Sequence, residues 1–392
     1  MQREAADPGR SGTTLVVAAL SARYLAEAAC RAGWRVIALD LFGDADTRRC
    51  ADWRPIGPPE RAVIDAARLR EALADAAQDR AVAGWIAGGG FDGEAELLDA
   101  GAHHLPRLGM STAAMVALRT PQHFFETLDR LALRHPAVAW APPADPAGWL
   151  HKRGRGSGGW HIEPAGPAVV PSPDGYFQRR LDAPAMSALC LADGQRGRVV
   201  ALNRQHTQAL TASRPCVLAG LSGPVRAPAL QRRVKEALDG LVPAFGLRGL
   251  VSLDFLCVDG EPWWLEVNPR PPASLQLYDI DWPGGLIGAH LDALRGHLPA
   301  TLPALPGWRG VETLYAPMAC DLDDTPALAD DPALHDLPMP GAHFDAGAPV
   351  CSVTHRADDE IALRQGLAAR LEALRRRLVA HPHDTPEEET VR

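Results

Sequence analysis

The stretch that decides the fold is LVSLDFLCVDGEPWWLEVNPR, residues 250–270. Two apolar runs flank an Asp-Gly pair, which is typical of the tight turn of a β-hairpin. Asp254 interrupts the first run and Glu266 the second. A two-residue turn would place Asp254 opposite Leu265, whereas a three-residue turn would place it directly opposite Glu266. The spacing leaves both registers open.

The acidic residues of this hairpin suggest a metal site. Glu266 and Asn268 are two residues apart and share a face if the strand continues that far. Two carboxylates facing each other repel unless a cation lies between them, and oxygen ligands suit Mg²⁺ or Mn²⁺. We therefore predict that Asp254, Glu266 and Asn268 hold Mg²⁺ or Mn²⁺ against a nucleotide. The alternative is an exposed strand pair with solvated acids, which Trp263 and Trp264 make less favourable.

A second motif is the glycine-rich segment KRGRGSGG, residues 152–159. Of the 40 basic residues only Lys152 and Lys235 are lysines, so a lysine at this place calls for a reason. Consecutive glycines let backbone N–H groups converge on phosphate oxygens, and the lysine adds a charge. The segment matches G-x-G-x-x-G, but WHIEP follows it instead of a helix. We predict a phosphate-binding flap, and the alternative is a flexible surface loop.

The two motifs together resemble the ATP-grasp superfamily of carboxylate-amine ligases. The resemblance covers roughly residues 110 to 300, and LEVNPRPPAS is its most specific part. It implies an α/β and α+β architecture, with an N-terminal Rossmann-like domain before the ATP-grasp fold. It implies ATP and Mg²⁺ or Mn²⁺ as cofactors. The nucleotide-binding residues that it implies are Arg119, Lys152, Gly156, Ser157, Gly158, Gly159, Gln178, Arg179 and Leu181, and the catalytic residues are Arg270 and Lys152.

Two positions depart from the family's pattern. Arg119 stands where the family has an earlier phosphate-binding lysine, which keeps the charge but changes the geometry. Arg179 stands where the family often has an acidic residue beside the glutamine of the adenine hinge, so the ribose contacts are in question. Arg270 meets the transferred phosphate if the motif holds, or else braces the metal carboxylates.

Changes in composition and in strand and helix patterns along the chain predict its domains. Strand and helix patterns alternate in residues 1–110 without the dinucleotide fingerprint, which predicts a parallel α/β substrate domain. The ATP-grasp domain is expected at 111–300, with its flap subdomain at about 137–180. A C-terminal segment at 301–380 is expected to pack on it, and 381–392 to be a disordered tail.

Each of three polar residues outside the motifs allows two interpretations of its role. Arg23 and Asp40 follow strands at the edge where open α/β sheets bind ligands, or they form local ion pairs and caps. His206 touches substrate, or it has a structural role after its strand.

Composition excludes several classes of protein. The chain has 392 residues, 46% of them hydrophobic, and a net charge of −8, and its apolar runs are too short for a membrane span. No block of like charge favours nucleic acid. The seven dispersed cysteines and the charged opening residues argue against a disulfide framework and a signal peptide, so we expect a cytoplasmic protein without nucleic acid or membrane partners.

The resemblance implies an ADP-forming ligase that joins a small-molecule carboxylate to an amine through an acylphosphate, and it allows a homodimer. The whole chain also resembles ATP-grasp proteins associated with one-carbon carrier cofactors, which implies adding an amino acid to a pterin or furan precursor. A carboxylase of the biotin-carboxylase type and a non-catalytic ATP-binding regulatory protein are the alternatives. Bicarbonate-dependent ADP release would favour the first, and tight ATP binding without turnover the second.

Overall fold

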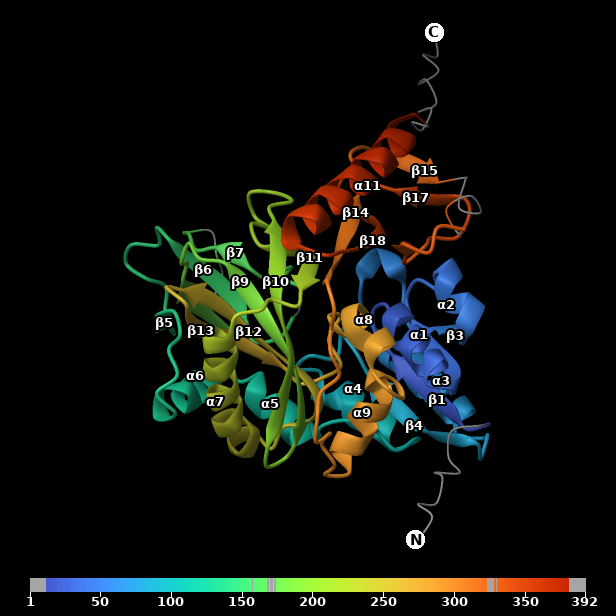
Figure 1. Cartoon of the computed structure of the whole chain (residues 1–392), viewed down its shortest axis with the longest axis horizontal. Helices are drawn as coiled ribbons and strands as arrows, with labels where there is room; N and C mark the ends of the chain where they lie inside the picture. Colours follow the sequence, from blue (N-terminus) through green and yellow to red (C-terminus); the bar gives the residue numbers. More distant parts are fainter. Residues whose placement is uncertain are drawn as a thin grey trace.

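A computed structural model describes residues 12–156, 158–167, 169, 172, 174–322, 328 and 330–380. The predicted tail at 381–392 and Ser157 lie outside these described residues. Figure 1 shows the N-terminal α/β unit on one side, a large antiparallel sheet on the other, and the C-terminal hairpin and helix above them.

The N-terminal unit is a parallel sheet of four strands in the order β3-β2-β1-β4. β1 and β2 are buried along nearly their whole length, which fits their unbroken apolar runs. The strands are β1 (Thr14–Ala18), β2 (Arg35–Asp40), β3 (Asp52–Pro55) and β4 (Val82–Ala87). The helices are α1 (Arg23–Arg31), α2 (Ala45–Cys50), η1 (Pro59–Arg61), α3 (Ala66–Ala76) and α4 (Ala95–Ala102).

A small antiparallel sheet carries the glycine-rich flap. Helices α5 (Thr112–Leu118) and α6 (Pro121–Arg130) lead into it from the N-terminal unit. Its strand order is β5-β8-β6-β7. The strands are β5 (Val138–Ala139), β6 (Trp149–Arg153), β7 (Glu163–Pro164) and β8 (Gly175–Arg179). Lys152 on β6 pairs with Tyr176 on β8, so the flap begins where β6 ends.

The large sheet has eight strands in the order β13-β12-β9-β10-β11-β14-β18-β16. Its strands are β9 (Ala185–Asp193), β10 (Gly197–Gln208), β11 (Val217–Gly223), β12 (Arg248–Val258), β13 (Glu261–Asn268), β14 (Trp308–Tyr315), β16 (Leu334–His335) and β18 (Pro349–Ala357). The remaining elements are α7 (Pro228–Phe245), α8 (Leu275–Tyr278), η2 (Asp279–Asp281), α9 (Gly285–Leu294), β15 (Cys320–Leu322), β17 (Ala342–Phe344) and α11 (Glu360–Ala380).

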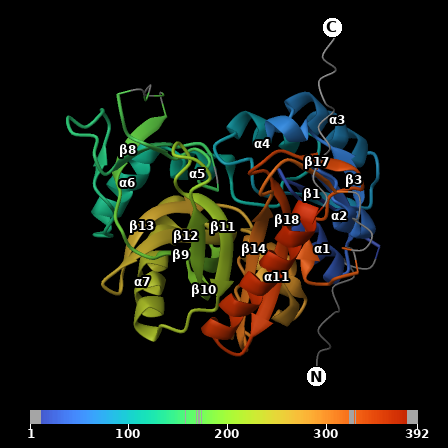
Figure 2. The same cartoon turned by 90° about the horizontal axis from the view of Figure 1, so that it is seen from above.

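The C-terminal segment joins the large sheet directly. β14 pairs with β11, β18 pairs with β14, and β16 pairs with β18, all antiparallel. Figure 2 shows α11 lying along β14 and β18. Hydrogen-bonded strands therefore run without a break from the hairpin of residues 250–270 to β18, and the last helix packs on β14 and β18. The domain boundaries named above remain predictions, because a shared ladder fixes no boundary.

The register of the hairpin differs from both alternatives. Val258 pairs with Glu261, so the turn has two residues, and Asp259 and Gly260 both have positive φ, at 50° and 78°. A bulge in the ladder next to Asp254 shifts the register by one residue, which places Asp254 opposite Glu266. The carboxylates therefore face each other without the three-residue turn.

Arg23 and Asp40 are held by partners within the protein, Arg23 by a distant residue of the C-terminal segment and Asp40 by nearby ones. The guanidinium of Arg23 donates to Asp336 from Nε and Nη2, at 3.0 Å each. Asp40 accepts backbone hydrogen bonds from Ala22 and Gly43, and the indole of Trp53 donates to it at 2.6 Å. Of the two interpretations, these contacts favour ion pairs and turn stabilisation over a ligand site.

Candidate active site

The carboxylates of the hairpin lie in a buried polar cluster at the inner end of β12 and β13. Asn268 donates to Asp254 Oδ2 and to Glu266 Oε1, at 3.2 Å each. Ser252 donates to the other oxygen of Asp254 at 2.6 Å. Burial and the charge of Glu266 raise the pKa of Asp254 to about 6. The two carboxylates thus share one desolvated site, which favours binding a cation between them.

Arg119 joins this cluster from the turn between α5 and α6. Its guanidinium donates to Glu266 Oε2 at 3.2 Å and to Asn268 Oδ1 at 2.6 Å. Burial alone would raise the pKa of Glu266, but Arg119, followed by His161 and Lys152, outweighs it and holds that pKa below its usual value. Arg119 therefore contacts two of the three predicted metal ligands directly.

Asp92 connects the N-terminal unit to this cluster. Its side chain follows β4 and is 3% exposed. One of its oxygens accepts from Arg119 at 2.9 Å, and both accept from Nε of Arg270, at 3.1 and 2.9 Å. Burial would raise the pKa of Asp92, but Arg270 and Arg119 lower it below its usual value. Asp92 is thus an anion that orients both arginines.

Lys152 lies on the opposite wall of the site. Its ammonium donates to Gln178 Oε1 at 2.8 Å, and burial lowers the pKa of the lysine. The Nε2 of Gln178 is buried and has no hydrogen-bond partner among the described residues. His161 lies near Glu266 and Lys152, and burial lowers its pKa to about 4, so its ring is neutral at pH 7.

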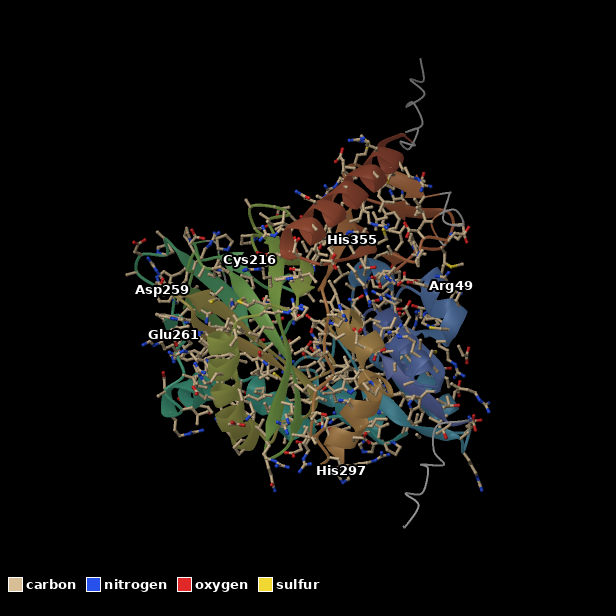
Figure 3. All side chains as sticks on the ribbon, viewed as in Figure 1. Arg49, Cys216, Asp259, Glu261, His297 and His355 are labelled. Atoms are coloured by element: carbon tan, nitrogen blue, oxygen red, sulfur yellow. The ribbon has the colours of Figure 1, made fainter. Side chains whose placement is uncertain are left out.

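The flap covers the cluster. Gly156 and Gly159 have positive φ, at 128° and 80°. A side chain on Gly156 would meet the ring of His161 at 2.8 Å, and one on Gly159 would overlap the carbonyl oxygen of Cys216, which Figure 3 labels above the large sheet. Gly158 accepts a hydrogen bond from the backbone N–H of Leu218 at 3.0 Å. Glycine is required at this contact because the flap backbone packs on the segment before β11.

Two predicted nucleotide ligands are placed differently. The guanidinium of Arg179 donates to the carbonyl of Ala147 at 2.9 Å and lies 5.9 Å over the ring of Trp149. It therefore contacts the back of the flap sheet instead of the carboxylate cluster. Leu181 follows β8, two residues beyond Arg179, at the connection from the flap sheet to β9. The adenine and ribose contacts of both residues remain predictions.

A small cavity of about 20 Å³ adjoins the cluster. Arg119, Phe125, Tyr176 and Glu266 are among the residues that line it. A cavity of this size holds about one water molecule, so aromatic and charged side chains here pack almost without free space. The flap and the charged side chains leave little free volume, so a nucleotide would require the flap to lift.

The sequence of residues 123–274 matches the family model of the ATP-grasp domain. The chain carries an ATP-grasp domain. This confirms the predicted family and, with the observed sheets, the predicted fold class. The family match confirms the expected enzyme class, an ADP-forming ligase, and the expected cofactors, ATP and Mg²⁺.

Solved structures share the fold over nearly the whole chain. Biotin carboxylase of Campylobacter jejuni, in a βγ-ATP complex, has a TM-score of 0.67 and 12% identity, covering 90% of this chain and 89% of that one. N5-carboxyaminoimidazole ribonucleotide synthetase of Thermotoga maritima has a TM-score of 0.63 and 14% identity, covering 91% and 98%. Phosphoribosylamine–glycine ligase of the same organism has a TM-score of 0.64 and 14% identity, covering 92% and 96%.

These likenesses show the fold alone. No curated protein matches the sequence significantly. None of the described helices combines the length and the apolar character that a membrane span needs.

The cluster fits a divalent cation. Glu266 Oε2 and Asn268 Oδ1 both accept from a guanidinium, so these oxygens already face a positive charge. Asp254 supplies a third oxygen from the adjacent strand, and such oxygen donors suit Mg²⁺. Lys152 and the flap amides lie where they could meet anionic oxygens, which fits a Mg²⁺-nucleotide.

The sequence did not predict Asp92, His161 or Gln205 as part of this site. Gln205 on β10 donates to Asp254 Oδ2 at 3.0 Å. Asp92 lies shortly after three consecutive glycines that follow β4, at the sheet edge where open α/β sheets bind ligands. This position is the feature of the sequence that could have indicated Asp92. His161 is a lone histidine after the flap, and no pattern distinguishes it.

Proposed function

We propose that this protein is an ATP-dependent ligase that activates a small-molecule carboxylate as an acylphosphate and joins it to an amine. The observation that carries the proposal is the convergence of two facing carboxylates, Arg119 and Lys152 beneath a glycine-rich flap, within a matched ATP-grasp domain. Phosphoryl transfer asks mainly for positioning and for neutralisation of charge, and these side chains supply both.

The roles follow from the positions of the side chains. Asp254, Glu266 and Asn268 would hold Mg²⁺, which supplies neutralisation of the phosphate charge when bound. Lys152 and the amides of Gly156, Gly158 and Gly159 would bind phosphate oxygens. Arg119, which contacts Glu266, would move onto the phosphates as the cation replaces it.

Arg270 would contact the transferred phosphoryl group or the acylphosphate. Its Nε is held by Asp92, which leaves the rest of the guanidinium to act as a donor. A carboxylate oxygen of the substrate attacks the γ-phosphorus and ADP leaves. The amine nitrogen then attacks the acyl carbon, phosphate leaves with the C–O bond electrons, and the nitrogen loses a proton.

The finer proposals concern the substrates and the setting. Addition of an amino acid to a cofactor precursor is our proposed net reaction, and we expect a cytoplasmic protein, with a homodimer as an allowed assembly.

Titration calorimetry with the full chain tests the nucleotide site: ATP should bind in the presence of Mg²⁺, and binding should weaken in Glu266→Ala. ADP that forms only with bicarbonate would instead support a carboxylase. ATP binding without turnover on any substrate pool would support a regulatory protein.

A further inference from the structure

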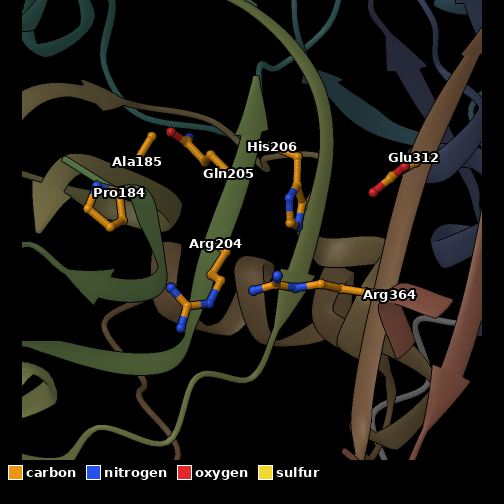
Figure 4. A pocket seen from close by; sticks show the side chains of 7 residues that line it. All are labelled: Pro184, Ala185, Arg204, Gln205, His206, Glu312 and Arg364. Carbon is orange, nitrogen blue, oxygen red and sulfur yellow. The ribbon is translucent and has the colours of Figure 1, made fainter. Parts of the chain in front are cut away.

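A second, larger pocket lies beside the candidate active site, between β10, β14 and α11. Its volume is about 310 Å³. The polar side chains that line it are Arg204, Gln205, His206, Glu312 and Arg364. Figure 4 shows the side chain of Arg364 extending from one wall of the pocket toward Arg204 on the other. Gln205 belongs to the ATP site through its hydrogen bond to Asp254, and the other four residues have no role in the ATP site described above.

Two cations meet at one end of the pocket. Arg204 Nε lies 2.9 Å from Glu360 Oε1 in an ion pair, and Arg364 Nη2 donates to the same oxygen at 2.6 Å. The two guanidiniums share one carboxylate, so this end keeps one positive charge in excess. Burial lowers the pKa of His206, and the charges of Arg364 and Arg204 lower it further, so its ring is neutral at pH 7. A carboxylate ligand would complete the charge balance here.

An anion lies at a separate place on the wall. Glu312 on β14 forms no hydrogen bond or ion pair within the part of the chain that the structure describes, and burial raises its pKa. The nearby charge that opposes this rise is Arg375 of α11. Figure 4 shows its carboxylate and the His206 ring directed toward the same space. An ammonium group would pair with this half-buried carboxylate.

The two lining arginines, Glu360 and Glu312 together carry no net charge, and Arg375 acts on Glu312 from outside the lining residues. The arginines form a cationic end of the pocket and Glu312 an anionic one. A neutral molecule with separated charges of its own matches this arrangement better than a simple anion. Gln205 forms one wall and donates to Asp254, so a bound molecule would lie next to the predicted metal ligands.

We propose that this pocket binds one substrate of the ligase as a zwitterionic amino acid, with its carboxylate on Arg204 and Arg364 and its ammonium group toward Glu312. That the bound amino acid is a substrate rests on the proposed ligase function. That the pocket binds a zwitterion rests only on the side chains that line it.

Titration calorimetry with the full chain and each of the twenty standard L-amino acids, with and without Mg²⁺-ADP, tests this assignment. At least one amino acid should bind. Its N-acetyl and carboxamide derivatives should each bind about tenfold more weakly or worse, because each lacks one charged partner.

Variants then locate the site. Arg364→Leu and Glu312→Gln should each weaken binding by about tenfold or more. Arg376→Leu is the matched control, since Arg376 lies on the same helix, pairs with Glu372 and is 77% exposed, and it should bind as the wild type does. Arg364 is itself 62% exposed, so its replacement should leave folding intact.

Three results would overturn the proposal: no binding of any amino acid with or without Mg²⁺-ADP, equal binding of the N-acetyl derivative, or binding that Arg364→Leu and Glu312→Gln leave unchanged. Binding of inorganic phosphate in place of an amino acid would identify an anion site and would also overturn it. Failure of the ligase function appears separately, as loss of ATP binding or turnover, because Glu266→Ala should not change the amino-acid affinity measured without nucleotide.

Discussion

Replacement of Asp92 by Asn tests whether one buried carboxylate organises the arginines of the ATP site. Asp92 is 3% exposed and holds Arg119 and Arg270, whose guanidiniums are also buried. Removing one partner of a buried ion pair costs about 3–5 kcal/mol, because the remaining charge is left uncompensated. Arg119 keeps Glu266 as a partner, whereas Arg270 loses the one carboxylate with which it forms an ion pair among the described residues, so we expect a loss of about 3 kcal/mol.

The assay is urea unfolding of the full chain, followed by fluorescence. Asp65→Asn is the matched control, since Asp65 caps α3 at the surface and asparagine caps a helix equally well, so this variant should unfold at nearly the same urea concentration as the wild type. The same Asp92→Asn protein should bind Mg²⁺ about tenfold more weakly, because Arg119 then pairs more closely with Glu266. An Asp92→Asn protein as stable as the control would refute the role of Asp92.

Three further predictions concern the flap, the metal and one buried histidine. Gly159→Ala should lower ATP affinity by about tenfold, because its side chain prevents the flap from packing on Cys216, while Gly166→Ala has open space and should match wild type; calorimetry compares them. EDTA should weaken ATP binding to the wild-type protein and change little in Asp254→Ala; persistence of the full EDTA effect in that variant would place the metal elsewhere. Burial lowers the pKa of His290 to about 4, so the folded protein keeps this ring neutral at pH values where the unfolded chain protonates it. The free energy of unfolding should therefore fall by about 1.4 kcal/mol per pH unit as the pH falls from about 6.5 toward 4. His290→Gln should flatten this slope in urea unfolding.

The hairpin shows what could be predicted from the sequence. Apolar runs and an Asp-Gly turn identify two strands, and the spacing of Asp254 and Glu266 leaves open whether they meet. The turn length alone could not give the register, because a bulge beside Asp254 supplies the extra residue. A bulge depends on how β12 also pairs with β9, and that long-range contact has no local signature.

The charged groups around the carboxylates show where sequence reasoning ends. Arg119 was expected on phosphate and instead contacts Glu266 and Asn268 in this structure. Arg270 was expected on phosphate or on the metal carboxylates, and its Nε is held by Asp92. Both outcomes depend on partners that lie far away in the sequence, Glu266 and Asn268 for Arg119 and Asp92 for Arg270. The spacing of a motif therefore does not predict which charged residues pair when the chain folds.

The most direct test of the central claim is ADP formation from ATP by the purified full chain, with Mg²⁺ and a fraction of cellular small molecules as the substrate pool. Glu261→Ala is the matched control for Glu266→Ala, because Glu261 is on the same strand but lies at its outer end, as Figure 3 shows, where it pairs with Arg233. We predict substrate-dependent ADP and phosphate from the wild type and from Glu261→Ala, and none from Glu266→Ala. ADP formation that survives in Glu266→Ala, or ATP binding without any ADP across all fractions, would contradict the proposed ligase.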